Sequence, residues 1–434
     1  MTAATDTDTQ AREARAFAKA AVRLVPFLTI AYTLNYMDRN NVGFAALTMN
    51  RETGLTATEF GFGAGILFLG YSTFEVPSNL ALYRFGARRW ISRIMITWGL
   101  VSAATAFVGS AWSWYVLRFM LGLAEAGFFP GITFYLATWF PADYRARMLA
   151  WFVAGIPLST VIGGPLSGLL LQLDGLGGIA GWKWLFIIEG LPSALLGIAA
   201  LWVLPDAPED ATFLDAEEKR LVRARLDAEK RDREVRSLWP ALTDPRVLIL
   251  SVAQFGFTAG SYGVGIWLPQ ILKTANLSNL TIGFTTGACY TVASVAMIVW
   301  AGWVDRRGGA IRHVTLACLL STVGLLLAIR PTNIWLSLAW ITVALIGITA
   351  ARAIFWTIPT RFLTGVAAAG GLAFINSVGT LGGFVGPYAV GWLKDATGQF
   401  SAGLVAMAAL LALSTVMAFW LERVADYAPA RAAA

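Results

Sequence analysis

The chain has 434 residues, of which 57% are hydrophobic and only 14% are charged, and its mean hydropathy is +0.63. Soluble proteins carry about 25% charged residues, so this composition excludes a soluble globular fold and indicates an integral membrane protein. The net charge of +7 does not require a nucleic-acid partner, because the basic residues are spread along one membrane face instead of forming a patch.

Residues 1–23 are polar, carry mixed charges and lack the apolar run and cleavage site of a signal peptide. We therefore expect a cytoplasmic N-terminal segment followed by a first helix that is retained. About twelve apolar stretches come next, each near the roughly 20 residues that cross a membrane as a helix. They lie at 24–47, 59–82, 92–110, 113–138, 147–171, 185–204, 247–271, 281–303, 313–330, 333–358, 367–392 and 402–421.

Residues 205–246 interrupt the apolar pattern with a charged stretch that suits a helix on the cytoplasmic membrane surface. This linker separates a six-helix bundle at 24–204 from a second one at 247–422, and a cytoplasmic tail at 423–434 follows. The predicted fold class is an all-α integral membrane protein with two pseudo-symmetric six-helix bundles.

The basic residues predict the orientation of these helices. When the twelve spans are threaded through a membrane, most of the 33 lysines and arginines fall on the side of the two termini, which the positive-inside rule makes cytoplasmic. The other side receives only Arg51, Lys183, Lys273, Arg330 and Lys394.

The two halves repeat each other at a fixed offset. Pro165 follows a glycine pair in the fifth span, and Pro387 occupies the matching place in the eleventh span, 222 residues later. The same offset carries the turn at 83–86 onto the turn at 305–308. Parallel halves with a site between them are typical of secondary transporters, in which one half moves against the other.

Four ionisable residues lie inside apolar stretches: Asp38, Arg39, Arg118 and Glu125. A charge at the bilayer centre costs roughly 2.5 to 3.5 kcal/mol on insertion scales, so such residues usually pair or act on a substrate. Asp38 and Arg39 diverge by about 100° on a helix, so we expect one to face a cavity and the other a neighbouring helix. Arg118 and Glu125 are seven residues apart and share one face.

An arginine binds a carboxylate through a planar fork of donors, so Arg39 and Arg118 are candidate substrate anchors. When an anion occupies these arginines, Asp38 or Glu125 loses counter-charge and binds a proton more readily. This arrangement predicts proton-coupled carriage of an anion by alternating access.

The chain resembles the major facilitator superfamily over nearly its whole length. Two cytoplasmic turns resemble the turn motifs of that superfamily, although Tyr83 stands where an aspartate is commonest. The motif residues in these turns are Arg84, Gly86, Arg88, Asp305 and Arg306. The stretch 118–122 resembles the arginine motif of the fourth helix, which is associated with proton coupling.

Five further stretches are similar to the anion:cation symporter family, whose members take up sugar acids, tartrate, phthalate and hydroxyphenylacetate. They are 36–39, 70–79, 124–131, 355–359 and 376–387. The resemblance implies Asp38 and Glu125 as proton sites and adds Tyr71, Asn376 and Trp356 as candidates for substrate binding. Arg352 is a third intramembrane arginine: if it faces the cavity, the substrate is expected to be a dicarboxylate or an aromatic carboxylate packed on Phe355 and Trp356.

These features predict a secondary transporter that takes up a small organic carboxylate with protons. A proton-coupled exporter of small organic molecules remains an alternative, because the fifth span partly resembles the antiporter motif of drug exporters, and a non-transporting anion sensor is a further one. We expect no enzymatic activity, no metal and no cofactor besides the proton. The expected setting is the inner membrane of a bacterium, as a monomer, with both termini cytoplasmic.

Overall fold

The computed structural model describes residues 2–230, 243–330, 333–363 and 365–426, which form helices and short connections without a β-strand. The helices are α1 (Thr2–Asn40), α2 (Val42–Thr53), α3 (Ala57–Phe85), α4 (Ala87–Ala104), α5 (Ala111–Glu125), α6 (Phe128–Trp139), α7 (Ala142–Val153), α8 (Gly155–Leu170), α9 (Gly181–Val203), α10 (Ala216–Lys230), α12 (Pro245–Lys273), α13 (Asn279–Arg307), α14 (Ala310–Ala328), α15 (Ile334–Phe355), α16 (Gly365–Thr397) and α17 (Phe400–Asp426).

Ten helical segments of the described chain are long and apolar enough to cross a membrane, which confirms the all-α membrane fold. Two more long helices, α3 with 29 residues and α16 with 33, lie at the predicted second and eleventh spans. Part of the predicted linker at 205–246 and most of the predicted tail at 423–434 lie outside the described residues.

Three of the predicted spans are each divided into two consecutive helices in the structure. The first span divides into α1 and α2 at Asn41, the fourth into α5 and α6 at Gly127, and the fifth into α7 and α8 at Ala154. The continuous helix predicted at 113–138 is therefore wrong at its centre. Gly127 has a φ of 85°, which a residue with a side chain rarely adopts, so glycine permits this break.

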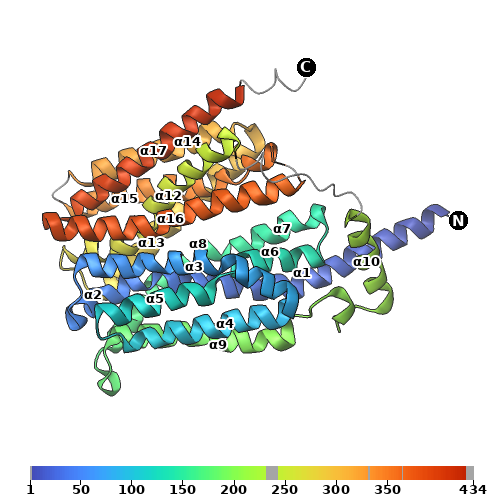
Figure 1. The fold of residues 1–434 in the computed structure, drawn as a ribbon, viewed down its shortest axis with the longest axis horizontal. Coiled ribbons are helices and arrows are strands. Elements are labelled where there is room, and N and C mark those ends of the chain that lie inside the picture. The colour runs from blue at the N-terminus through green and yellow to red at the C-terminus, as the bar shows by residue number, and fades with distance from the viewer. Residues whose placement is uncertain (1, 231–242, 331–332, 364, 427–434) are drawn as a thin grey trace.

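The helices form two groups that lie side by side. Figure 1 shows α1 to α9 in one group and α12 to α17 in the other, with α3 and α8 running next to the second group. Contact between the groups is closest where α3 meets α16 and where α8 meets α13. Glycines allow this approach: a Cβ atom added at Gly164 would lie 2.8 Å from the carbonyl oxygen of Gly283.

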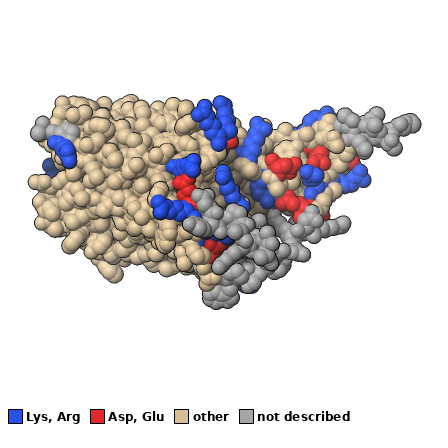
Figure 2. Space-filling view, turned by 90° about the horizontal axis from the view of Figure 1, so that it is seen from above, with Lys and Arg blue, Asp and Glu red and all other residues tan. Residues whose placement is uncertain are grey.

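Charged side chains gather at one end of the molecule. Figure 2 shows most lysine, arginine, aspartate and glutamate side chains at the end that carries the start of α1, with a small basic spot at the other end and a mostly uncharged surface between them. Helix α10 lies at that same charged end (Figure 1). We call this end the linker side and the opposite end the far side.

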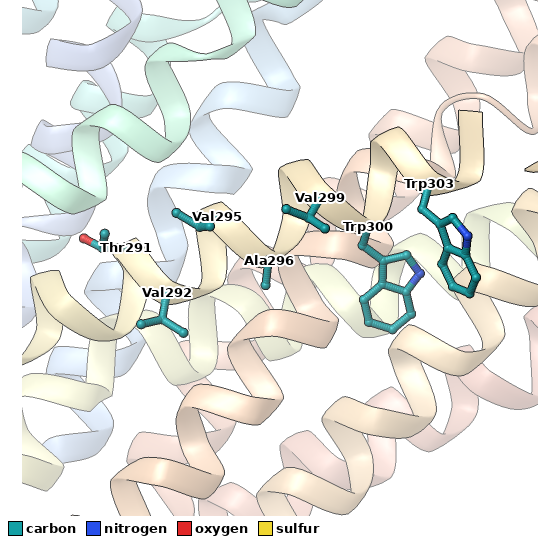
Figure 3. Close-up of a pocket in the computed structure, with 7 residues that line it drawn as sticks. All are labelled: Thr291, Val292, Val295, Ala296, Val299, Trp300 and Trp303. Atoms are coloured by element: carbon teal, nitrogen blue, oxygen red, sulfur yellow. The ribbon is translucent and has the colours of Figure 1, made fainter. Parts of the chain in front are cut away.

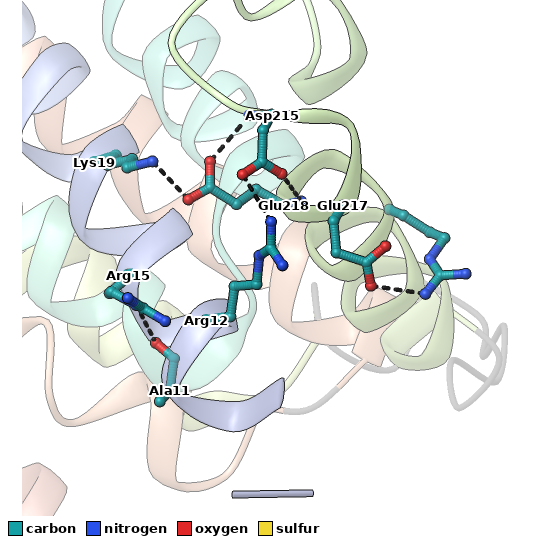
Figure 4. Close-up of polar contacts among 8 residues, drawn as sticks. Ala11, Arg12, Arg15, Lys19, Asp215, Glu217 and Glu218 are labelled. Atoms are coloured by element: carbon teal, nitrogen blue, oxygen red, sulfur yellow. Dashed lines mark hydrogen bonds and ion pairs between the residues drawn. The ribbon is translucent and has the colours of Figure 1, made fainter. Parts of the chain in front are cut away.

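Helix α10 is attached to the start of α1 by ion pairs (Figure 4). Arg12 contacts Asp215 at 3.0 Å and Lys19 contacts Glu218 at 2.6 Å. The backbone N–H of Glu218 and the guanidinium of Arg12 lower the pKa of Asp215. At Glu218, burial acts to raise the pKa, but the ammonium of Lys19 and the backbone N–H of Asp215 lower the pKa by more. Both carboxylates are therefore ionised at neutral pH.

The two predicted turn motifs lie on the linker side, at the C-terminal ends of α3 and α13. Gly86 and Gly308 both have positive φ, at 86° and 75°. The backbone N–H of Arg88 donates to Asp206, which follows α9, at 2.8 Å. Asp206 thus places a carboxylate at the turn that lacks its usual aspartate at Tyr83.

The far side of the interface between the groups is closed by a polar contact. Asp395, near the end of α16, accepts from the backbone N–H groups of Ala57 and Thr58 at 3.2 and 2.6 Å, and from the hydroxyl of Thr58 at 2.6 Å. The N-terminus of α3 carries a partial positive charge that favours this carboxylate. Nearby, a Cβ atom at Gly61 would lie 2.4 Å from the carbonyl oxygen of Pro387, so the two backbones leave no room for a passage there.

We expect Asp395→Ala to open the far side more often, because a lost cap of about 1 kcal/mol shifts a two-state equilibrium roughly fivefold. The measurement is the rate at which a membrane-impermeant maleimide, added from the far side, labels Thr286→Cys in a background without the native cysteines. Asp395→Asn keeps an acceptor and should label at an intermediate rate. Equal rates in all three proteins would show that this contact does not hold the far side closed.

Candidate functional site

A cavity of about 440 Å³ lies between the two groups of helices. Its wall includes residues from α1, α3 and α8 on one side and from α12, α13, α15 and α16 on the other. In the described part of the chain, the lining contains two arginines, Arg39 and Arg352, and no aspartate or glutamate. This volume accommodates a small organic molecule, and the charge of its wall favours an anion.

Arg39 reaches the cavity from the end of α1 and holds Glu125. Its Nε donates to Glu125 Oε2 at 2.6 Å, and the Glu125 side chain is fully buried whereas that of Arg39 is 11% exposed. The rings of Tyr71 and Tyr36 lie 5.0 and 5.4 Å from the guanidinium. The arginine is therefore the only member of the ion pair that lines the cavity.

The break in the fourth span determines the surroundings of Glu125. This residue is the last of α5, where the free backbone carbonyl groups give the helix a partial negative charge. A carboxylate at this end is disfavoured, and Arg39 offsets that effect. Glu125 Oε1 is buried without a hydrogen-bond partner, so the bond to Arg39 is the contact that its ionised form depends on.

Arg352 faces the cavity from α15. Its Nη2 donates to the hydroxyl of Tyr36 at 2.7 Å, and the rings of Tyr36 and Tyr262 lie 5.6 and 5.9 Å from its guanidinium. No acidic side chain forms an ion pair with Arg352 in the described part of the chain. Tyr36 therefore lies between two guanidiniums, one from each half of the protein.

Asp38 and Arg118 do not line the cavity in this structure. Asp38 is fully buried and accepts hydrogen bonds from Trp98 at 2.9 Å, Ser102 at 2.7 Å and Ser193 at 3.2 Å. It faces α4 and α9 whereas its neighbour Arg39 faces the cavity, which is the divergence expected from their spacing. Arg118 is also buried, with the ring of Trp114 at 5.3 Å, so its predicted contact with substrate is not made from this position.

The other predicted binding residues lie in the cavity wall. Tyr71 lines it beneath Arg39, and Trp356 and Asn376 line it from the second half. Phe355 differs from the expectation: it is fully buried, does not line the cavity, and packs behind the lining residues Phe257 and Trp356 with ring centroids 5.1 and 5.4 Å away.

Several lining residues were not predicted from the sequence. Gln254, Thr258 and Tyr262 recur every four residues along α12, so they form one polar stripe on an otherwise apolar helix. That spacing was the signal available to find them. Tyr36 lies in the stretch 36–39 that resembles the symporter family, but the sequence did not indicate what it contacts. Its position between Arg39 and Arg352 arises only when the two halves of the protein pack together.

A second hollow lies along α13 and has a different chemistry. Its lining is almost wholly apolar and includes Val295, Val299, Trp300 and Trp303 (Figure 3). Several of these side chains are exposed on the outer surface of the helix bundle. Such an apolar surface suits contact with lipid, and it offers no group that would hold an anion.

Comparison with known proteins supports a transport function. Residues 28–387 match the Major Facilitator Superfamily. A protein of Agrobacterium vitis named "Putative tartrate transporter" is 48% identical over 413 residues, which are 95% of this chain and 92% of that protein. A "Quinolone resistance transporter" of Acinetobacter baumannii is 38% identical over 92% of both chains.

The fold also matches a solved structure of a bacterial homologue of the human lysosomal transporter Spinster in an inward-facing, unoccupied conformation. The TM-score is 0.77 at 17% identity, and the match covers 94% of this chain and 99% of that one. Fold, family profile and relatives agree with the resemblance seen in the sequence, including its anion-transporting branch. The chain is a multi-pass membrane transporter, not an enzyme, and belongs to the Major Facilitator Superfamily.

Proposed function

We propose that this chain is a proton-coupled symporter that takes up a small organic dicarboxylate by alternating access. The observation that carries this proposal is the cavity wall, which presents Arg39 and Arg352 and no acidic side chain among the described residues. The relatives named as tartrate transporters support the same substrate class.

The two arginines suit an anion with a carboxylate at each end. Each guanidinium offers a planar fork that binds a carboxylate through two hydrogen bonds. Because Arg39 comes from one half and Arg352 from the other, a dicarboxylate would join the halves through its two ends. Asn376 and Tyr71 provide neutral hydrogen-bonding groups for the atoms between them.

Glu125 couples the substrate to a proton because it shares Arg39 with the substrate. When a substrate carboxylate engages Arg39, the ion pair weakens, and a buried carboxylate without its partner is destabilised by about 3 to 5 kcal/mol. Uptake of a proton by Glu125 removes that charge. In this scheme substrate and proton are bound together.

Asp38 is the second proton site in this proposal. The three groups that donate to it are neutral, so in the described structure no cation balances its charge directly. A dianion loaded together with one proton on Asp38 and one on Glu125 would add no net charge to the carrier. That balance matters because each uncompensated charge costs or yields about 2.3 kcal/mol per 100 mV of membrane potential.

The proposed orientation assigns the two ends of the molecule to the two sides of the membrane. The linker side carries most of the basic residues, so the positive-inside rule makes it cytoplasmic, and the membrane is the bacterial inner membrane. The closed contact at Asp395 then faces the periplasm.

A second candidate is a proton-coupled exporter of small organic molecules. The relative named as a quinolone resistance transporter favours it. In an exporter the substrate would move outward while protons move inward down the same gradient, so the direction of substrate movement separates the two functions.

The direct test is uptake of tartrate into proteoliposomes under an inward proton gradient. We expect accumulation by the unmodified protein. In Glu125→Gln, gradient-driven accumulation should be lost and tartrate counterflow should survive, because the glutamine removes the titrating group and leaves the cavity lining intact. Asp38→Asn should behave in the same way. Efflux driven by the gradient would favour the exporter, and absence of carboxylate transport under every gradient would reject the symporter.

Arg352 tests the substrate class. Arg352→Gln should weaken tartrate binding about tenfold to a hundredfold, the equivalent of a charge-assisted hydrogen bond of about 1.5 to 3 kcal/mol. Binding of 2,3-dihydroxybutanoate, which has a methyl group in place of one carboxylate, should change little. Arg352→Lys keeps the positive charge but loses the planar fork of donors, so its affinity for tartrate should lie between those of the unmodified protein and Arg352→Gln. Equal losses for both ligands in titration calorimetry would contradict a two-carboxylate substrate.

A further inference from the structure

Glu189 is a buried carboxylate that the cavity does not use. It lies on α9, is 3% exposed and accepts a hydrogen bond from the hydroxyl of Ser167 at 2.8 Å through Oε1. Its Oε2 is buried without a partner, and no lysine or arginine of the described chain forms an ion pair with it. A carboxyl group at this depth is stable only if its charge is removed or balanced.

Glu189 shares a seam between helices with Asp38. Ser193 lies four residues after Glu189, so the two side chains occupy one face of α9. Ser193 donates to Asp38 at 3.2 Å, which places Glu189 about one helical turn closer to the far side than that contact. Two carboxyl groups therefore lie along one seam whose described hydrogen-bond donors are neutral.

Among the described residues, no lysine or arginine from the helices packed against α9 forms an ion pair with Asp38 or Glu189. α4 presents Trp98 and Ser102 to Asp38, and α8 presents Ser167 to Glu189. The acidic group on α2, Glu52, is held at the start of α9 by Trp182 at 2.7 Å and Lys183 at 3.6 Å. The charged groups at Glu189 are thus Asp38 in the same seam and this separate cluster nearer the far side.

A small hollow lies between the seam and the substrate cavity. It has a volume of about 20 Å³ and is lined by Asn41, Ser167 and Thr286 among others. Asn40, Thr160 and Tyr290 line both this hollow and the main cavity. Ser167 therefore touches the hollow on one side and Glu189 on the other.

The hollow suits a water molecule. A space of about 10 to 15 Å³ holds one water if polar partners are present. The side-chain nitrogen and oxygen of Asn41 and the hydroxyl of Thr286 are buried there without hydrogen-bond partners, as is Oε2 of Glu189 in the adjoining seam. Unsatisfied polar atoms of this kind indicate a site for water.

We propose that Glu189 is a further proton-carrying residue of this transporter, loaded from the far side through the hollow at Asn41, Ser167 and Thr286. A water in the hollow passes a proton to the Ser167 hydroxyl oxygen while Ser167 passes its own proton to Glu189 Oε1. The water takes up a proton from the far side as it gives one to Ser167, so the carboxylate becomes a carboxylic acid while the water and the serine end unchanged. This inference rests on the proton coupling proposed above.

The position of the hollow links this transfer to alternating access. The hollow lies between α8 and α13, next to the close approach of Gly164 to Gly283. Separation of the two halves on the far side would expose it to water, and closure would seal it. Glu189 would thus take up its proton when the far side is open and hold it when that side is closed.

The test is Glu189→Gln in proteoliposomes, with tartrate as substrate. We expect counterflow to remain and accumulation under an inward proton gradient to fall to the level seen without a gradient. Ser167→Ala should likewise keep counterflow and lose gradient-driven accumulation. Ser167→Thr, which keeps a hydroxyl, should accumulate tartrate as the unmodified protein does. If Glu189→Gln does not fold, as judged by gel filtration, the two Ser167 variants decide the matter.

Three results would overturn the proposal. Accumulation by Glu189→Gln and Ser167→Ala with the pH profile of the unmodified protein would show that no proton passes this way. Equal loss of counterflow and accumulation in these variants would assign Glu189 a packing role. A sodium gradient that drives uptake only when Glu189 is present would assign the site to Na⁺. By contrast, if tartrate uptake by the unmodified protein does not depend on the proton gradient, the proposed symport itself is rejected, independently of the results for Glu189.

Discussion

Arg39 and Glu125 form an ion pair at a depth where the carboxylate is fully buried and only the arginine reaches the cavity. A buried pair of this kind is stable as a pair and costly when separated, so any anion that takes the arginine also changes the state of the glutamate. The break after α5 strengthens this dependence, because it leaves Glu125 at the negative end of a helix. One contact thereby connects substrate binding with proton binding.

The rest of the molecule places this pair between two halves that are able to separate. Glycines let α8 approach α13 closely, and Asp395 fastens α16 to the start of α3 on the far side. Arg352 brings a second cation to the same cavity from the other half, and it is held there by a hydrogen bond to the hydroxyl of Tyr36. The proposed dicarboxylate would bridge the halves and so favour their closure, while the seam with Asp38 and Glu189 lies just behind the cavity wall.

The sequence predicted the membrane class, the helical fold and the divergence of Asp38 from Arg39, because hydropathy and helical periodicity are local properties. It did not predict the break at Gly127, whose positive φ depends on how α5 and α6 pack. It also expected Arg118 to bind the substrate from its chemistry alone, whereas packing buries this side chain away from the cavity wall. It also left open whether Arg352 faces the cavity, since that depends on packing between halves far apart in the chain. Resemblance to a family identified candidate residues, but the cavity wall itself is formed by tertiary contacts.

The most direct measurement of the central claim is the number of protons taken up when tartrate binds, from titration calorimetry in buffers of different ionisation enthalpy. If the substrate displaces Glu125 from Arg39, binding should take up protons from solution, and Glu125→Gln should take up fewer while still binding tartrate. Tartrate binding with no proton uptake, or with the same uptake in Glu125→Gln, would contradict the claim that this ion pair couples the two events.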